Sequence, residues 1–233
     1  KKDGLAYLKT KLGLDESAEL ILGSPFDYAN QVRLYLTRKM PEPNDKEAFE
    51  PVASEKILKY LKQTQDRAFV LFTSYDLMNR IYERLNPVLE TMGLITYKQG
   101  KDLSRHQMLE QFKNQSDTLG MGSVIFGADS FWQGVDVPGP ALENVIITKL
   151  PFPVPTSPLV EAKIEQMERT GIDSFINYFI PEAVIRLRQG FGRLIRTRTD
   201  KGIVVILDNR IITRQYGRFF LESLPECEII IEE

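Results

Sequence analysis

Short apolar runs rich in β-branched residues recur along this chain of 233 residues, separated by stretches with helical periodicity. Near-continuous apolar runs of about four to eight residues are typical of strands buried on both faces of a parallel sheet. Alternating strands and helices therefore predict an α/β sandwich with a mostly parallel central sheet and right-handed crossovers. The predicted strands cover residues 20–22, 68–73, 94–97, 123–127, 144–150 and 202–208.

Helical periodicity is clearest at residues 74–92, where leucine or isoleucine occupies every fourth position from 77 to 89. Ser74 is the predicted N-cap of this helix, and Gly93 follows its end. Further helices are predicted at 104–113, 159–169 and 175–197, the last broken at Pro181. We expect residues 1–233 to form a single domain, with an exposed insertion at 38–51 and a proline-rich connector at 151–158.

Composition excludes several classes of protein. A hydrophobic fraction of 42% rules out bulk disorder. The single cysteine, Cys227, excludes a disulfide framework and a cysteine-held zinc or iron–sulfur cluster within this chain, and the single histidine, His106, is expected to be a solvated surface residue. No apolar run approaches the ~18 residues of a membrane span. Because the net charge is −2, any nucleic-acid binding must use local basic patches.

Familiar phosphate-binding and nucleophile motifs are missing from the sequence. There is no G-x-x-x-x-G-K-[ST] loop, no complete dinucleotide fingerprint and no G-x-S-x-G. The chain opens Lys1-Lys2-Asp3, without an initiator methionine or a signal peptide. We therefore expect a fragment of a longer, cytoplasmic protein that binds no ATP phosphates through a P-loop of its own.

The strongest signal is an arginine-rich segment, residues 181–198, which is predicted to be helical. At about 100° per residue, four polar side chains share an arc of about 80°: Arg186, Gln189, Arg193 and Arg196. Rows of guanidinium groups suit bidentate recognition of phosphate oxygens, although a solvated basic face is the alternative. Gly190 and Gly192 would each cost about 1 kcal/mol inside a helix, so they indicate a close approach or a bend at that point.

Several segments resemble the motifs of superfamily 2 helicases. Residues 189–196, QGFGRLIR, resemble motif VI, and residues 128–139, ADSFWQGVDVPG, resemble motif V of the DinG/XPD-like branch. The sequence FTSY at 72–75 resembles motif IV, whereas 23–28 and 149–155 resemble further DinG-family signatures. These blocks occur in the order typical of that family and span nearly the whole chain. The chain is therefore identified as similar to the second motor domain of a DinG-family helicase.

The resemblance implies a fold and a set of partners. It implies a RecA-like three-layer sandwich, a P-loop NTPase-type domain that lacks its own P-loop. ATP with Mg²⁺ would be bound by the first motor domain of the same polypeptide, which would carry the Mg²⁺ ligands, and single-stranded DNA would be the other partner. Arg193 and Arg196 would reach the γ-phosphate of that ATP, with Gln189 ordering the attacking water or the arginines.

Other residues are implied to contact the nucleotide. Asp136 matches the motif V acid that binds a ribose hydroxyl or a motif VI arginine, and Arg186 extends the row of arginines toward the phosphates. Gly134 would let the backbone approach the nucleotide, although a tight turn before Pro138 is an equal alternative.

Four residues are candidates for DNA contact, each with an alternative role. Thr73 and Ser74, at a strand end and helix start, could bind phosphate, but Ser74 could also simply cap its helix. Trp132, the sole tryptophan, could stack on a base, although buried packing is favoured two to one. Lys149 is a candidate for contact with a backbone phosphate only because it directly precedes the proline-rich connector.

Three functions remain open from the sequence. The first is the motor half of an ATP-dependent DNA helicase. The second is a nucleotide-sensitive DNA-binding module in a DinG-type protein whose main activity is an N-terminal 3′-5′ exonuclease. The third is an unrelated α/β phosphate-binding enzyme, which would need a P-loop or a catalytic carboxylate pair that the sequence does not display. In the first two cases, the isolated chain is expected not to hydrolyse ATP.

Overall fold

A computed structural model of the chain describes residues 5–14, 17–20, 22–64, 67–118, 122–133 and 142–233. Its centre is a seven-stranded sheet in the order β3-β4-β2-β5-β6-β1-β7, in which every neighbouring pair is parallel. The strands are β1 (Val32–Thr37), β2 (Arg67–Leu71), β3 (Ile95–Lys98), β4 (Ser123–Gly127), β5 (Asn144–Ile147), β6 (Gly202–Ile206) and β7 (Glu228–Glu232).

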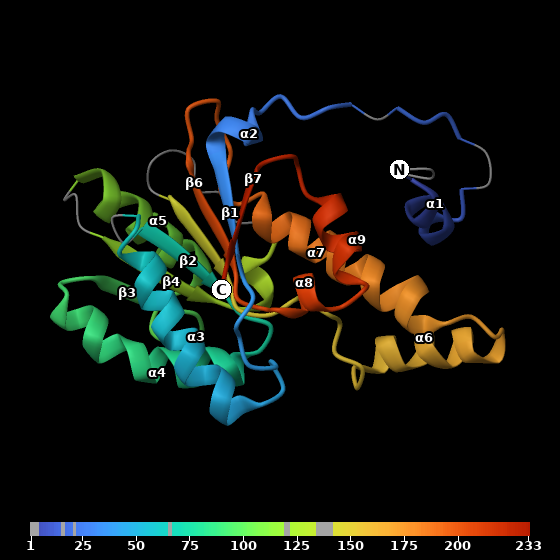
Figure 1. Cartoon of the computed structure of the whole chain (residues 1–233), viewed down its shortest axis with the longest axis horizontal. Coiled ribbons are helices and arrows are strands. Elements are labelled where there is room, and N and C mark those ends of the chain that lie inside the picture. The colour runs from blue at the N-terminus through green and yellow to red at the C-terminus, as the bar shows by residue number, and fades with distance from the viewer. Residues whose placement is uncertain (1–4, 15–16, 21, 65–66, 119–121, 134–141) are drawn as a thin grey trace.

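Helices cover both faces of this sheet and make a three-layer sandwich (Figure 1). One face is packed by α3 (Lys46–Leu61) and α4 (Tyr75–Thr91). The other face is packed by α5 (Arg105–Thr118), α7 (Ile180–Phe191), α8 (Arg210–Thr213) and α9 (Gly217–Ser223). The remaining helical segments are α1 (Ala6–Leu12), α2 (Tyr28–Gln31), α6 (Pro158–Arg169), a 3₁₀ turn at Asp129–Phe131 and a π turn at Phe175–Phe179.

Strand β2 illustrates why the apolar runs are continuous. Phe69 and Leu71 belong to the core under α5 and α7, whereas Val70 and Phe72 belong to the core under α3 and α4. All four side chains are fully buried. A strand that packs on both faces cannot alternate apolar and polar residues, so the predicted parallel α/β sandwich is confirmed.

The strand predictions are confirmed for β2 to β6 and fail at the edge of the sheet formed by β1 and β7. Residues 20–22 were expected to form a strand, but Leu20 and Leu22 lie in no regular element and are each 77% exposed. Strands β1 and β7, which are neighbours in the sheet, were not predicted from the sequence. The β1 run is interrupted by the exposed Arg33, and β7 is short and half exposed.

The helix predictions hold with three corrections. Helix α4 begins and ends within one residue of the predicted 74–92, whereas α5 extends five residues past its predicted end. The expected insertion at 38–51 is a loop only as far as Asp45, because α3 begins at Lys46 and its Phe49 is fully buried. Helix α7 ends at Phe191, so the predicted helix through residue 197 is too long.

The expected irregularity at Pro181 is present. A π turn at Phe175–Phe179 runs directly into α7, where the Ile180 N–H group donates to the Phe175 carbonyl oxygen, and Pro181, which has no N–H group to donate, is the second residue of that helix. Within the described residues, no helix has the length and apolar character that a membrane crossing would need.

Candidate functional site

The predicted site residues fall at opposite ends of the strands. Thr73, Ser74 and Lys149 follow β2 and β5, at the carboxyl end of the sheet, where ligands of open parallel sheets usually bind. Arg193 and Arg196 belong to the segment between α7 and β6, which enters the sheet at its amino end. The structure therefore separates the predicted phosphate-contacting arginines from the predicted DNA-contacting residues.

We call residues 192–200 the arginine turn. Gly192 ends α7 as its C-cap, and Arg193 Nε donates back to the Gln189 carbonyl oxygen at 3.0 Å. Farther along, the backbone N–H groups of Arg196 and Thr197 both donate to Asp200 Oδ2 at 2.8 Å. The turn is thus folded around a carboxylate that is only 6% exposed.

A second contact fixes the arginine turn to the sheet. Gln31, just before β1, donates from Nε2 to the carbonyl oxygens of Thr197 at 3.0 Å and Asp200 at 2.7 Å. Asp200 is the only acidic residue between Glu182 and Lys201, and its oxygens accept the Arg196 and Thr197 amides and the Thr197 hydroxyl. The one local carboxylate therefore holds backbone in place. Sequence reasoning missed both Gln31 and this use of Asp200.

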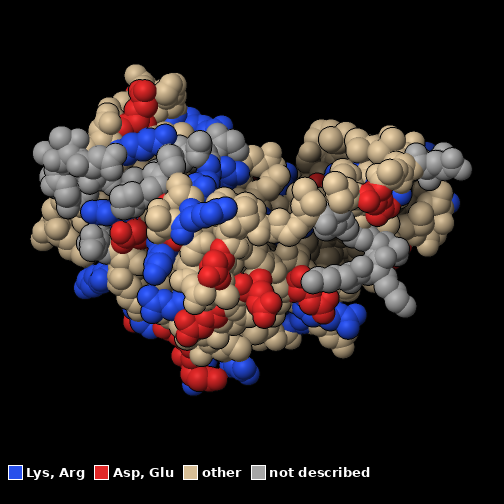
Figure 2. Space-filling view, turned by 90° about the horizontal axis from the view of Figure 1, so that it is seen from above, with Lys and Arg blue, Asp and Glu red and all other residues tan. Residues whose placement is uncertain are grey.

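The amino end of the sheet carries basic side chains. Figure 2 looks onto this end and shows a group of Lys and Arg side chains at the upper left and centre, whereas the lower part of the view holds most of the Asp and Glu side chains together with further basic ones. The sequence places Arg193, Arg196, Arg198 and Lys201 within nine residues there. This surface suits an anionic ligand.

Three other predicted nucleotide contacts have different outcomes. Gly134 and Asp136 lie outside the described residues. Arg186 lies about two turns before Arg193 along α7 and lines a separate groove of about 580 Å³ together with Glu182. The expected single row of four polar side chains is therefore split, because the helix ends before Arg193.

Gln189 is half-buried near the end of α7. Its Oε1 atom is buried and finds no hydrogen-bond partner among the described residues. A buried amide oxygen usually has a partner, so this atom is available to a group that the described chain does not supply.

At the carboxyl end of β2, Ser74 is the N-cap of α4. Its hydroxyl accepts from the Leu77 N–H at 3.3 Å, as the sequence predicts, and the residue is exposed. Thr73 is half-buried beside it. Capping leaves the exposed start of the helix open to a ligand, so both of the roles considered for Ser74 are compatible with its position.

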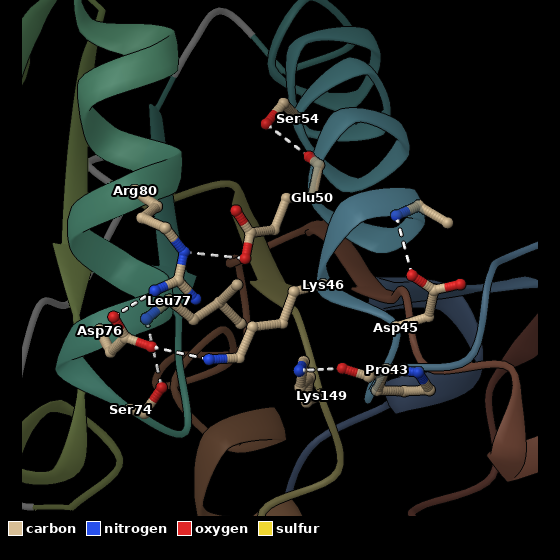
Figure 3. A network of polar contacts seen from close by, with 11 residues as sticks. Pro43, Asp45, Lys46, Glu50, Ser54, Ser74, Asp76, Leu77, Arg80 and Lys149 are labelled. Carbon is tan, nitrogen blue, oxygen red and sulfur yellow. Dashed lines mark hydrogen bonds and ion pairs between the residues drawn. The ribbon is translucent and has the colours of Figure 1, made fainter.

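Lys149 has a structural contact that its sequence position did not reveal. Its ammonium group donates to the Pro43 carbonyl oxygen and lies 4.9 Å from the centre of the Phe49 ring (Figure 3). Burial lowers the pKa of the Lys149 amine from its ordinary value, which the nearby Asp208 carboxylate partly offsets. The side chain thus ties the end of β5 to the loop before α3.

An ion-pair network missed by sequence reasoning lies next to Lys149 (Figure 3). Arg80 Nε donates to Glu50 Oε1 at 2.8 Å, and the same guanidinium contacts Asp76, whose other oxygen lies 3.4 Å from Lys46 Nζ. The Arg80 hydrogen bond lowers the pKa of the Asp76 carboxyl. These contacts join α3 to the first turn of α4, directly after Ser74.

Trp132 is part of the core. Its side chain is 4% exposed, and its Nε1–H donates to the Phe72 carbonyl oxygen at 2.7 Å. The indole lies against Gly190, where a Cβ atom would come within 2.9 Å of two ring carbons. The structure therefore supports buried packing of Trp132 over base stacking. The indole is also the group whose close approach to the helix was expected from Gly190.

His106 is a surface residue, as expected, with its imidazole 81% exposed and 3.9 Å from the Glu110 carboxylate. Within the described part of the chain, no three His, Cys, Asp or Glu side chains are grouped to hold a metal ion.

The fold and the arginine turn define a RecA-like α/β domain without a P-loop. Comparison with known proteins agrees: the family described as "Helicase C-terminal domain" matches residues 57–227. The ATP-dependent DNA helicase YoaA of Haemophilus influenzae is 42% identical over 215 residues, which are 92% of this chain and 32% of that protein. The 3′-5′ exonuclease DinG of Bacillus subtilis is 33% identical over 230 residues, which are 96% of this chain and 24% of that protein.

Solved structures show the same fold. The S. tokodaii Xpd4 structure matches with a TM-score of 0.64 at 17% identity, over 93% of this chain and 41% of that one. The chain belongs to the helicase C-terminal domain family, and its relatives include helicases named DinG and YoaA. It spans about a third of the length of the curated DinG and YoaA helicases that it matches.

Proposed function

We propose that this chain is the second motor domain of an ATP-dependent DNA helicase. In this proposal, Arg193 and Arg196 stabilise the charge that develops on the γ-phosphate of ATP, and the ATP is bound by another motor domain of the same polypeptide. Thr73 and Ser74 contact the phosphates of single-stranded DNA. Closure of the two domains on ATP, and their release after hydrolysis, would move the DNA.

The construction of the arginine turn carries this proposal. Donors that stabilise a transferring phosphoryl group are most effective when they are preorganised, because they then need no rearrangement during the reaction. The Arg196 amide is fixed by the buried Asp200 carboxylate, and Gln31 fastens the same turn to the sheet. The buried Gln189 Oε1 atom, unpartnered among the described residues, supports a ligand-ordering role for that side chain beside Arg193.

The proposed contact with DNA is based on the exposed start of α4. Backbone N–H groups at a helix start and the hydroxyls of Thr73 and Ser74 suit phosphate oxygens. The salt bridges of Arg80 fix this helix start to α3, so the phosphate-contacting turn is held by tertiary contacts. Lys149 is a weaker candidate, because its ammonium already donates to Pro43.

The decisive experiment compares two arginines of the same turn in the full-length protein. Arg196→Ala is expected to reduce DNA-stimulated ATP turnover by ~10³-fold or more, the scale of arginine fingers in other phosphoryl-transfer proteins. The matched control is Arg198→Ala, an exposed arginine two residues away, which should retain nearly normal turnover. Near-normal turnover in Arg196→Ala would remove the proposed role. The isolated chain should show no ATPase activity, since it has no P-loop.

A second function is favoured by one relative. The Bacillus subtilis protein, named as a 3′-5′ exonuclease, aligns with 96% of this chain. The same arginine turn could then make DNA binding sensitive to nucleotide in a protein whose main activity is nucleolytic. ATP-dependent strand displacement by the intact protein would favour the motor, and nucleotide-dependent DNA retention without displacement would favour the second function.

A further inference from the structure

The last residue of β4 and the loop that follows it, residues 127–133, are closely packed; we call this segment the loop after β4. A Cβ atom on Gly127 would lie 2.5 Å from Phe131 Cγ, because the Phe131 ring folds back over the strand end. Asp129 has φ = 24°, and it is the only non-glycine residue of the described part of the chain with positive φ. Strained residues of this kind persist where surrounding contacts hold them, and they concentrate at functional sites.

The loop contacts the helix that leads into the arginine turn. The ring carbons of Trp132 occupy the space where a Gly190 side chain would be, and Leu71 at the end of β2 lies 3.3 Å from the same point. Gly190 is three residues before Arg193 and accepts its backbone N–H at 3.2 Å. No side chain separates the indole from this end of α7.

The same loop contacts the phosphate-contacting turn from two directions. The Trp132 Nε1–H group donates to the carbonyl oxygen of Phe72, the residue directly before Thr73. On the other side, Gln99 accepts from the Ala128 N–H at 2.7 Å and donates to the hydroxyl of Tyr75, the first residue of α4, at 2.5 Å. The turn between β2 and α4 is therefore bracketed by this loop.

We infer that Trp132 is a positioning residue that couples the arginine turn to the phosphate-contacting turn at Thr73 and Ser74. The inference rests on the proposed function. A shift of the end of α7, when Arg193 and Arg196 engage ATP, displaces the indole, and the indole carries the Phe72 carbonyl with it. Coupling of this kind needs close packing, because a packed core repositions its side chains as a unit and does not deform gradually.

Substitution can remove the contacts of the indole. Trp132→Phe removes the N–H donor to Phe72 and the six-membered ring whose carbons lie against Gly190. Tyr82→Phe is the matched control. Its hydroxyl lies 3.3 Å from the Thr96 hydroxyl, and its ring belongs to the core on the opposite face of the sheet, so the substitution removes one part-buried hydrogen bond that involves neither Trp132 nor Gly190.

The readout is the ratio of ATP turnover with saturating oligo-dT to turnover without DNA, in the full-length protein. Trp132→Phe should lower this ratio about five- to tenfold, the usual size of a coupling between two sites. Tyr82→Phe should change it less than about twofold, because it removes one hydrogen bond that involves neither turn. A purely structural role for Trp132 predicts a lower Tm for Trp132→Phe with an unchanged ratio.

Gly190→Ala gives an independent test that leaves the N–H donor intact. Alanine favours the helix, but its Cβ must displace the indole that lies 2.9 Å away, so the ratio should again fall severalfold. A ratio equal to wild type in both Trp132→Phe and Gly190→Ala overturns the coupling alone. A wild-type protein whose turnover does not respond to DNA overturns the proposed function, and the coupling falls with it.

Discussion

Asp200→Ala offers a direct measure of how firmly the arginine turn is built. The Asp200 carboxylate is buried and accepts three hydrogen bonds: two from backbone N–H groups and one, at 2.5 Å, from the Thr197 hydroxyl. Alanine removes all three and leaves the Arg196 and Thr197 amides without their acceptor. The loss should therefore exceed that of an ordinary surface substitution.

The magnitude follows from these bonds. A buried donor left without a partner costs about 1–3 kcal/mol, and two such donors give a loss of about 3 kcal/mol when both are partly buried. In a domain of this size, 1 kcal/mol lowers Tm by about 2–4 °C, so Asp200→Ala should lower Tm by about 6–12 °C. Asp200→Asn keeps one acceptor oxygen for the two backbone N–H groups, but it removes the charge and replaces the other oxygen with an NH2 group, so its loss should be smaller, about 1–2 kcal/mol.

Thermal unfolding of the isolated chain measures this loss, with the fluorescence of Trp132 as the probe, since it is the only tryptophan and is buried. Asp173→Ala is the matched control, because Asp173 is exposed and its carboxylate accepts a single N–H, that of Ile176 at 3.1 Å. Its Tm should fall by less than about 4 °C. Equal Tm losses in Asp200→Ala and Asp173→Ala would refute the view that Asp200 organises the turn.

Two further predictions concern a helix start and a helix contact. Ser74→Ala removes the N-cap of α4 and should lower the unfolding free energy by ~1 kcal/mol, whereas Ser74→Gly should lose only a few tenths; oligo-dT affinity measured on both variants separates capping from phosphate contact. Burial raises the pKa of the Glu182 carboxyl, but hydrogen bonds from Lys11 and Tyr7 outweigh burial and hold this pKa below its ordinary value of 4.5. The ionised carboxylate therefore stabilises the contact with α1 at pH values above 4.5, and this stabilisation is lost as the pH falls through the lowered pKa. Hydrogen exchange of the α1 amides should accelerate over that pH range. In Glu182→Gln, which carries no charge, these amides should exchange fast already at neutral pH.

The sheet was predictable where its strands are buried on both faces. Strands β2, β4, β5 and β6 are predicted from apolar runs alone, because both faces of each run pack against a helix layer. The edge strand β3 is predicted as well, although Tyr97 is its only buried residue. Strand β1 alternates, with Arg33 exposed between buried neighbours, so it lacks the continuous run. In β7, Ile229 is 50% and Ile231 44% exposed, so nothing distinguishes its short run from a surface segment.

The arginine turn shows what periodicity cannot supply. Arginines at helical spacing predict a helix as far as residue 197, and local propensity offers no reason to end it at Phe191 apart from Gly192. The chain leaves the helix because Asp200 and Gln31 capture the backbone that follows, and Gln31 lies 169 residues away from Asp200 in sequence. Contacts between residues so far apart in sequence form only when the sheet has assembled, so no local sequence pattern predicts them.

The position of Trp132 has a consequence for how the domain could work. Strands of a parallel sheet are held by ladders on both sides, so a ligand at one end of the sheet cannot move the other end by sliding a strand. Motion can pass more readily across the face, where α7 lies on the sheet. Gly190, at the end of α7, lies near Leu71 at the end of β2, and Leu194, just past the end of α7, lies near Gly202 at the start of β6. A change at the arginine turn therefore reaches Thr73 through side-chain packing on that face, and the indole of Trp132 lies on this path.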